Sequence, residues 1–581
     1  MSETVTPSVQ LQEIVADADM GGRAASGVSG AVISAVAVGW SLFQLWYASP
    51  LPFALGFGLL NDTEARALHL AIALFLGFLA YPGSRRRGVR YRVPIADWAM
   101  AFVGAFAGAY LFLFYNQLAT RPGVPILQDI VIATVGLVLL LEATRRAVGL
   151  PMTILALVFL AYIFLGPWLP DVVSHKGASL ERMISHMWLT TEGVYGVALG
   201  VSVSFIFIYV LFGSLLDRAG AGNYMMQVAF AALGHLRGGP AKVAVVSSGL
   251  NGLISGSSVS NVVSGGIFTI PLMKKAGYGG VKAGAIETAS SVNGQIMPPV
   301  MGAAAFLMVE YVGIPYSDIV KHAFLPAVIS YIALFYIVHL EALKLGMNPS
   351  AVRRSRPLRE RLLVCALVYW IALGAQRLFG DSAIWIIGGL LLATHIALLW
   401  DAARNPDLPQ DIDIDNPVLP DTWPTVRAGL HFLVPIGVLI WCLMIEQLSP
   451  ALSAFWATAT LIALMATQRP IVAFFRGVPA LPEWRTGLRE IVQGLNDGAR
   501  NMIGIGIATA TAGIIVGGIT LTGLGFRMTD FVEVVSQGNV IVMLLFTAFV
   551  CLVLGLGVPT TANYILVASL MAPVIVELGA Q

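Results

Sequence analysis

Two short stretches of the sequence combine helix-breaking residues with small side chains that carry oxygen atoms. The first is Ser255-Gly256-Ser257-Ser258, followed by Ser260 and Asn261. The second is Gly557-Val558-Pro559-Thr560-Thr561, followed by Asn563. Hydroxyl, amide and carbonyl oxygens suit a hard monovalent cation such as Na⁺, and a broken helix exposes such carbonyls inside a membrane. Both stretches are therefore candidate cation sites, with close helix packing as the structural alternative.

A third stretch, Asn293-Gly294-Gln295-Ile296-Met297-Pro298-Pro299, interrupts the apolar segment 283–312. Glycine and a double proline predict a discontinuous helix here, although a proline kink needs no ligand. We expect this break to lie beside the first stretch. The predicted ligands of one Na⁺ site are then Ser255, Gly256, Ser257, Ser258, Asn293, Gly294 and Pro298. Part of a second Na⁺ site is predicted at Gly557, Val558, Pro559, Thr560 and Thr561.

Helix N-termini that restart after such breaks direct partial positive charge into the cavity, which suits a small organic anion such as a carboxylate. The residues expected nearest the substrate are Ser260, Asn261, Asn293, Thr561 and Asn563. Glu287 is the one intramembrane carboxylate that we single out, as a supporting or proton-linked group. Other acidic residues of the apolar stretches lie near span ends, where salt bridges are expected: Asp97, Asp129, Glu142 and Glu192.

The composition identifies the medium in which these sites must lie. The 581 residues are 57% hydrophobic and 11% charged, with a mean hydropathy of +0.80. A soluble domain contains roughly 25% charged residues, so the chain is predicted to be an all-α polytopic membrane protein. Its net charge of +2 provides no basic excess for a nucleic-acid partner. No Gly-Lys pair occurs, so a phosphate-binding loop for an ATP-driven pump is not expected.

We predict about 13 transmembrane spans and two re-entrant helical hairpins, hairpin 1 at 241–272 and hairpin 2 at 539–576. The 32 residues of hairpin 1 would measure about 48 Å as one helix, which exceeds the ~30 Å hydrocarbon core. The spans are 29–48, 66–82, 96–116, 126–142, 152–169, 194–217, 283–312, 323–343, 362–379, 383–400, 428–446, 451–467 and 500–522.

Basic residues indicate the orientation, because Lys and Arg accumulate in cytoplasmic loops. With the N-terminus inside, the outer loops hold only Arg66, Arg121, Lys176, Arg182, Lys321, Arg377 and Arg527 of the 34 basic residues. Hairpin 1 then enters from the cytoplasm and hairpin 2 from the outside. The order Ser258, Asn261, Pro271, Gly277 recurs as Thr560, Asn563, Pro573, Gly579, which supports an inverted repeat.

Five motifs together resemble the fused small-plus-large membrane component of tripartite ATP-independent periplasmic (TRAP) transporters. They are LEATRR at 141–146, TEGVYG at 191–196, GLNGLISGSS at 249–258, NGQIMPP at 293–299 and GLGVPTT at 555–561. The resemblance implies Na⁺-driven symport of an organic acid across the bacterial inner membrane by an elevator-like mechanism. It also implies a separate periplasmic solute-binding protein that delivers the substrate, and no enzymatic activity.

The resemblance implies a domain organisation along the chain. The expected parts are a cytoplasmic tail (1–28), a small-subunit-like domain (29–150), a connecting helix and loop (151–185), a first large-subunit-like repeat (186–345), scaffold spans (346–480, with a cytoplasmic loop at 401–427) and a second repeat (481–581). No counterpart of 293–299 follows hairpin 2, so the second repeat is expected to be incomplete. The nearest alternative function is a receptor-independent Na⁺/dicarboxylate symporter. An ion channel or an intramembrane enzyme is the alternative from another class.

Overall fold

The computed structural model of the chain is helical, with no strand among the residues that it describes. Those residues are 23, 25, 27–83, 92–171, 173–255, 258–348, 383–409, 419–537, 539–555, 560–561 and 563–568. The contacts divide the chain into two compact units. The first unit contains Phe212–Met301 and Val320–Gly494, and the second contains Glu13–Leu211, Gly302–Ile319 and Leu495–Gln581.

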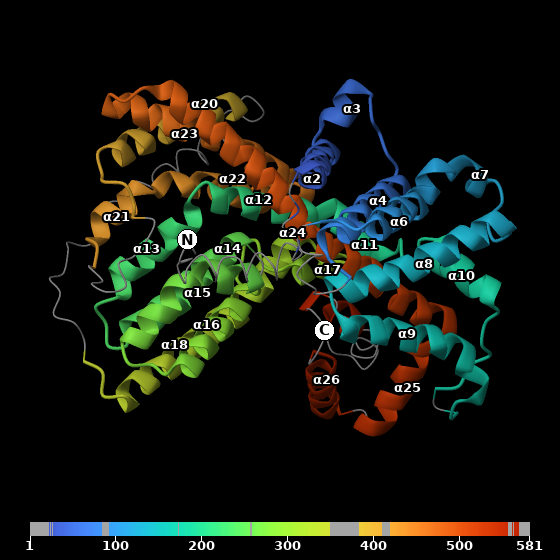
Figure 1. The fold of residues 1–581 in the computed structure, drawn as a ribbon. Helices are drawn as coiled ribbons and strands as arrows, with labels where there is room; N and C mark the ends of the chain where they lie inside the picture. The colour runs from blue at the N-terminus through green and yellow to red at the C-terminus, as the bar shows by residue number, and fades with distance from the viewer. Residues whose placement is uncertain are drawn as a thin grey trace, which may run out of the picture. The chain divides into compact units, whose positions relative to one another are not determined.

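The N-terminal part of the second unit is a bundle of apolar helices (Figure 1). They are α2 (Gly27–Ala48), α3 (Leu51–Leu55), α4 (Asp62–Ala80), α6 (Ile95–Leu113), α7 (Tyr115–Ala119), α8 (Leu127–Ala147), α9 (Leu150–Leu165), the 3₁₀ turn η1 (Gly166–Trp168) and α10 (Leu180–Trp188). α4 begins at a capping box in which Asn61 and Glu64 each accept a backbone N–H of the other. α4 packs closely on α6, because a Cβ on Gly108 would lie 2.9 Å from the backbone of Ala71.

The rest of the second unit comes from distant parts of the sequence. It comprises α11 (Val197–Val201), the π-helical segment η2 (Ser202–Ile206), the start of α12 (Phe207–Arg218), α17 (Ala303–Val312), the C-terminal half of α24 (Ala480–Thr522), α25 (Leu524–Ser536) and α26 (Val540–Gly555). Residues 560–561 and 563–568 are also helical.

The first unit contains the predicted hairpin 1 and the helices that follow it. They are α13 (Ala221–Leu233), α14 (Gly239–Ser255), α15 (Ser258–Lys275), α16 (Gly280–Gly294), most of α18 (Tyr316–Lys344), α20 (Ala383–Ala403), α21 (Thr422–Ala428), the 3₁₀ turn η4 (Leu430–Phe432), α22 (Leu433–Met444), α23 (Pro450–Arg476) and the start of α24. α23 starts at the N-cap Ser449 with Pro450 in its first turn, and it ends before Gly477, whose φ is +72°.

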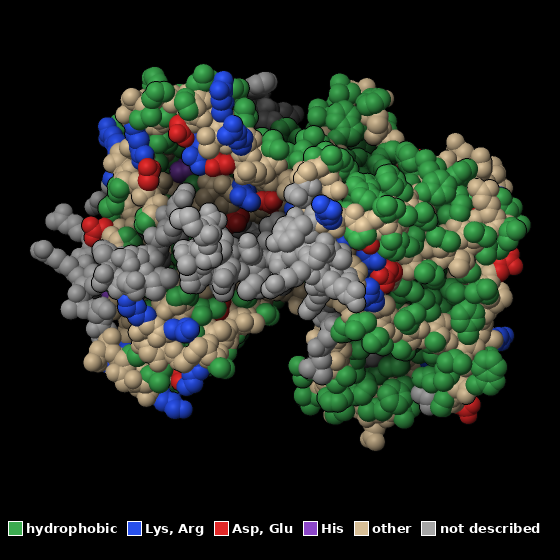
Figure 2. Space-filling view, viewed as in Figure 1, with side chains coloured by type: hydrophobic (Ala, Val, Ile, Leu, Met, Phe, Trp, Pro, Cys, Tyr) green, Lys and Arg blue, Asp and Glu red, His purple; other side chains and the backbone are tan. Residues whose placement is uncertain are grey.

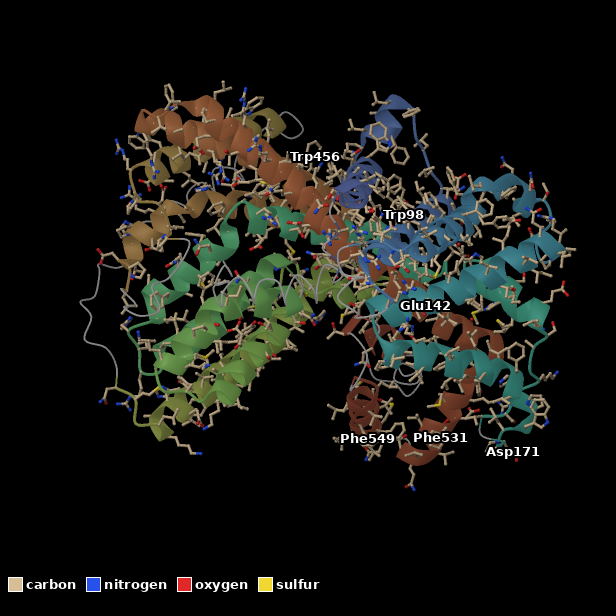
Figure 3. All side chains as sticks on the ribbon, in the orientation of Figure 1. Trp98, Glu142, Asp171, Trp456, Phe531 and Phe549 are labelled. Atoms are coloured by element: carbon tan, nitrogen blue, oxygen red, sulfur yellow. The ribbon has the colours of Figure 1, made fainter. Side chains whose placement is uncertain are left out.

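The chain is an all-α polytopic membrane protein. Within the described residues, nine helices are long and apolar enough to cross a membrane, or ten if the bent pair Thr422–Ala428 and Leu430–Met444 is one span. Figure 2 shows many hydrophobic side chains at the surface of the protein. On these helices, the large apolar side chains of Phe102, Val138 and Leu157 are 61%, 59% and 49% exposed. Phe549 of α26 is also exposed (Figure 3). Such a surface is typical of lipid contact.

The number of spans predicted from sequence is not reproduced one for one. The predicted span 362–379 lies outside the described residues, and the predicted span 283–312 consists of two helices, α16 and α17. The predicted span 500–522 is the end of α24, a continuous helix of 43 residues. Its first part, from Ala480, is too polar to have been recognised by hydropathy.

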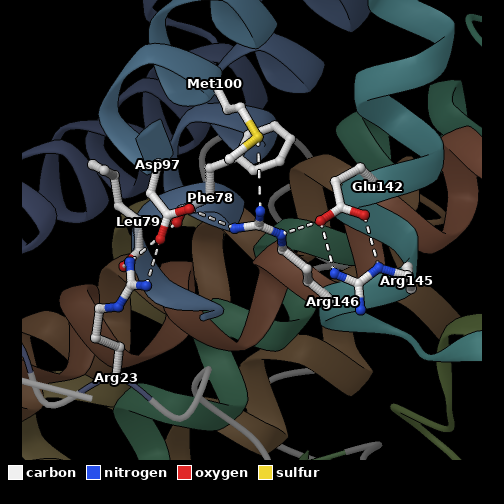
Figure 4. A network of polar contacts seen from close by, with 8 residues as sticks. All are labelled: Arg23, Phe78, Leu79, Asp97, Met100, Glu142, Arg145 and Arg146. Atoms are coloured by element: carbon white, nitrogen blue, oxygen red, sulfur yellow. Dashed lines mark hydrogen bonds and ion pairs between the residues drawn. The ribbon is translucent and has the colours of Figure 1, made fainter. Parts of the chain in front are cut away.

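Ion pairs and a hydrogen bond connect Arg23, which precedes α2, with the ends of α4, α6 and α8 in the second unit (Figure 4). Asp97, at the start of α6, accepts from Arg23 at 2.6 Å and from Arg146 at 2.8 Å. Arg146 also pairs with Glu142 at 2.7 Å, and Arg23 donates to the carbonyl of Leu79 at 2.9 Å. The expectation of salt bridges at span ends is confirmed for Asp97 and Glu142, and also for Asp129, which pairs with Arg121.

Candidate functional site

The segment predicted as hairpin 1 forms a helical hairpin. α14 ends at Ser255 and α15 begins at Ser258. Ala241 and Ala244, near the start of α14, share a core cluster with Met273, near the end of α15. The chain therefore doubles back on itself, over 239–275 rather than the predicted 241–272. Entry of this hairpin into the bilayer from the cytoplasm stays a prediction.

The helix after hairpin 1 is interrupted where the sequence predicts a break. α16 ends at Gly294, and α17 starts only at Ala303. The chain leaves α16 through turns in which the N–H of Ile296 donates to the carbonyl of Asn293 at 3.2 Å and the N–H of Met297 to that of Gly294 at 3.1 Å. Pro298 is buried, and the bond between Pro298 and Pro299 is cis.

The tip of hairpin 1 and the break lie side by side within the first unit. Gln295 Nε2 donates to Ser258 Oγ at 3.1 Å. Gly252 and Gly294 are in close backbone approach, because a Cβ on Gly252 would lie 2.5 Å from the Cα of Gly294. Glycine is required at this crossing. Asn261 is buried, and its Nδ2 donates to the carbonyl of Ser248 across the hairpin at 2.9 Å.

The predicted ligands of the first site are only partly described. Ser255 lies in α14, and Gly256 and Ser257 lie outside the described residues. Ser260, predicted near the substrate, lies in α15. Asn293 is half-buried in the last turn of α16. The structure thus brings together Ser258, Asn261 and the end of α16 at Asn293 and Gly294. Their oxygen donors suit a hard cation.

The second candidate site repeats one feature of the first. Asn563 Nδ2 donates to the carbonyl of Cys551 on α26 at 3.5 Å, as Asn261 does to Ser248 across hairpin 1. A Cβ on Gly555 would lie 3.1 Å from the Asn563 Nδ2. Thr560 and Thr561 are helical, and Gly557, Val558 and Pro559 lie outside the described residues.

Three residues of this arrangement were not predicted from sequence: Ser248, Gly252 and Gln295. Each contacts a residue of another helix: Ser248 contacts Asn261, Gly252 contacts Gly294, and Gln295 contacts Ser258. Gln295 belongs to the NGQIMPP stretch, so its amide was the available signal. Gly252 lies within the GLNGLISGSS stretch, but its close partner Gly294 follows only from how α14 crosses α16.

Comparisons with known proteins identify the family. Residues 135–581 match the family described as "Tripartite ATP-independent periplasmic transporter, DctM component". YgiK of Salmonella typhimurium, an uncharacterized protein, is 27% identical over 204 residues, covering 33% of this chain and 46% of YgiK. SiaT of Haemophilus influenzae, a sialic acid TRAP transporter permease protein, is 31% identical over 197 residues, covering 33% and 30% of the two chains. TeaC of Halomonas elongata, an ectoine TRAP transporter large permease protein, is 32% identical over 95 residues, covering 16% and 22%.

The aligned parts thus span less than half of the length of each of these relatives. The family match is far longer. It starts within α8 and includes both candidate sites. The chain belongs to the DctM component family of tripartite ATP-independent periplasmic transporters, a family of transporters rather than enzymes.

Proposed function

We propose that this chain is the membrane component of a Na⁺-coupled TRAP secondary transporter that imports a small organic anion across the bacterial inner membrane. The observation that carries the proposal is the packing of hairpin 1 against the broken helix α16 through Gly252 and Gly294. Two helix breaks that meet in one membrane protein offer backbone and side-chain oxygens to an ion at a common point.

One Na⁺ is held at Ser255–Ser258, Asn293, Gly294 and Pro298, and a second at 557–561. Asn261 and Asn563 lie next to these sites and orient the anion together with Ser260, Asn293 and Thr561. The named substrate of SiaT, sialic acid, is itself a carboxylate, which supports an organic acid as the substrate class here.

The N-terminal helices take the place of a small subunit fused to the large one. Three hydrogen bonds within the second unit support this proposal. Ser41 Oγ donates to the carbonyl of Leu495 at 2.7 Å, His69 lies 3.1 Å from Ser202 Oγ, and Gln44 donates to the carbonyl of Val203. Ser41, Gln44 and His69 all precede the family match, and their partners lie inside it.

A separate periplasmic solute-binding protein delivers the substrate, and the N-terminus is cytoplasmic. Transport follows an elevator-like movement of the hairpin-bearing helices against the rest of the protein. Hairpin 1 belongs to the first contact unit, whereas α26, the first helix of the predicted hairpin 2, belongs to the second. For both hairpins to move together, α26 must also slide against the other helices of the second unit.

Uptake into proteoliposomes tests the proposal. The purified chain is reconstituted alone or with a candidate secreted binding protein, which is loaded with the ligand that mass spectrometry identifies in it. We expect uptake only when an inward Na⁺ gradient and the loaded binding protein are both present. Uptake of free ligand without a binding protein would identify a receptor-independent symporter instead. Single-channel currents in a planar bilayer would contradict a carrier mechanism.

A further inference from the structure

Glu287 is a fully buried carboxyl group where α16 meets both arms of hairpin 1. Its Oε2 lies 2.5 Å from the hydroxyl of Thr269 on α15, and its Oε1 lies 3.3 Å from the hydroxyl of Ser248 on α14. Ser291, one turn along α16, lies 3.5 Å away. Gly265 leaves room for the carboxyl group, since a Cβ there would lie 2.9 Å from Oε1. Glu287 thus links three helices of the first unit.

The described side chains that lie within hydrogen-bonding distance of this carboxyl present hydroxyl groups to it. Within the described part of the chain, no ion pair involves Glu287. The titratable residue facing it from α18 is Tyr331, whose hydroxyl donates to the carbonyl of Ser290 at 2.9 Å. The charged residues of the helices packed against it are engaged or exposed elsewhere: Lys242 bonds His339, Lys282 pairs with Glu341, and Lys274 and Lys275 are exposed.

The hydrogen count at Thr269 permits two states of Glu287. Thr269 Oγ1 lies 3.1 Å from the carbonyl of Gly265 and 2.5 Å from Glu287 Oε2, but a hydroxyl has only one hydrogen to donate. If Thr269 donates to Gly265, then Glu287 must be protonated and donate to Thr269. If Glu287 is ionised, Thr269 must turn its hydrogen to the carboxylate and release the carbonyl. The protonation state of Glu287 therefore decides whether the Thr269 hydroxyl keeps its hydrogen bond to the Gly265 carbonyl in α15.

A buried carboxylate with hydroxyl partners alone is strongly disfavoured in a membrane protein, so the conformation seen here favours the neutral acid. Separation of α16 from hairpin 1 would admit water and favour ionisation. We propose that Glu287 is a proton-binding site, loaded while hairpin 1 packs on α16 and emptied when they separate. This inference rests on the proposed transport function and adds H⁺ to Na⁺ as a coupled ion.

Infrared difference spectroscopy of the full chain in lipid nanodiscs tests the site without substrate or binding protein. We expect a protonated carboxyl band that disappears reversibly as the pH is raised. The band is lost in Glu287→Gln and kept, at a shifted frequency, in Glu287→Asp. The matched control is Glu341→Gln, which removes an ion-paired glutamate from the same unit and leaves the band in place.

Reaction with dicyclohexylcarbodiimide, which modifies protonated carboxyls in apolar surroundings, provides a second measurement on the unmodified protein. We expect labelling of the peptide that contains Glu287 at low pH, and its loss at high pH. A carboxyl that is ionised throughout, or one that stays protonated until the protein unfolds, would overturn the inference. Na⁺-driven uptake is a separate readout: its absence with an intact titrating band contradicts the proposed function alone, and its presence with no band contradicts the proton site alone.

Discussion

At the scale of single residues, the crossing of Gly252 and Gly294 leaves no room for a side chain in the candidate site. Gly252→Ala places a methyl carbon only 2.5 Å from the Cα of Gly294. We expect a loss of stability of about 1–3 kcal/mol from overpacking, together with reduced uptake. Thermal unfolding of the purified variant and the proteoliposome assay measure both effects.

Gly284 is the matched control for this substitution. It lies in α16, the same helix as Gly294, and a Cβ there would meet nothing within 4 Å. Gly284→Ala should therefore leave uptake unchanged and raise helix stability by up to about 1 kcal/mol. Equal behaviour of Gly252→Ala and Gly284→Ala would mean that the crossing tolerates a side chain and does not constrain the site.

Ser258 tests the cation site itself. Its hydroxyl accepts a hydrogen bond from Gln295 Nε2, and Ser258→Ala removes this oxygen without adding bulk. We expect the Na⁺ concentration for half-maximal uptake to rise about tenfold, the effect of losing one contact to a charged group. Thr134→Ala is the control, because that exposed hydroxyl bonds only the carbonyl of Ile130 in its own helix. An unchanged Na⁺ dependence with normal uptake would show that Ser258 only packs.

Residue types alone singled out Ser258, Asn261 and Asn293, which the structure brings together at the tip of hairpin 1 and the end of α16, and their binding of a ligand stays a prediction. Residue types were not enough to identify Ser248 or Gln295, whose roles depend on which helix packs against which. A serine in the middle of a helix has the same local sequence signal whether or not an asparagine from another helix reaches its carbonyl.

At the scale of helices, the ion cluster at Asp97 connects the start of α6 with the end of α8 and with Arg23, which precedes α2 in the chain. Asp97→Asn removes the negative charge between two buried guanidinium groups, Arg23 and Arg146. We expect a loss of stability of about 3–5 kcal/mol, because both cations stay buried. The melting temperature of the purified protein measures it.

The comparison for Asp97 is an exposed pair of the same bundle. Asp62 pairs with Arg66 one turn apart in α4 and its side chain is 56% exposed. Asp62→Asn should cost less than about 1 kcal/mol. If Asp97→Asn and Asp62→Asn lower the melting temperature equally, the buried ion cluster does not stabilise these helix ends more than the exposed pair does.

Hydropathy located the helices well where they are uniformly apolar and failed where polarity changes along one helix. α2, α6 and α9 each cover a predicted span closely. The N-terminal part of α24 contains charged residues such as Glu483 and Glu490, which pair with Arg469 of α23, so no apolar window revealed it. Helix breakers were a stronger signal, since those at 255–258 and 295–299 predicted the turn between α14 and α15 and the break between α16 and α17.

At the scale of the whole molecule, the proposed fusion makes a prediction about a chain cut in two. Gly149 separates α8 from α9 and has φ +114°, so the cut falls between helices rather than within one. The contacts of Ser41 and His69 with Leu495 and Ser202 do not depend on this peptide link. Two co-expressed polypeptides, 1–149 and 150–581, should therefore assemble as separate small and large subunits do.

We expect the two polypeptides to co-purify through an affinity tag on either one, and to restore uptake with the binding protein and Na⁺. The 1–149 polypeptide expressed alone should be degraded, because buried polar groups such as His69 lose the partners that the second polypeptide supplies. Asp97→Asn in the split pair is an internal control: it weakens the bundle within the first polypeptide and should lower the amount of both. Stable accumulation of 1–149 alone, with no capture of 150–581, would show that the N-terminal helices are an independent domain and not a fused subunit.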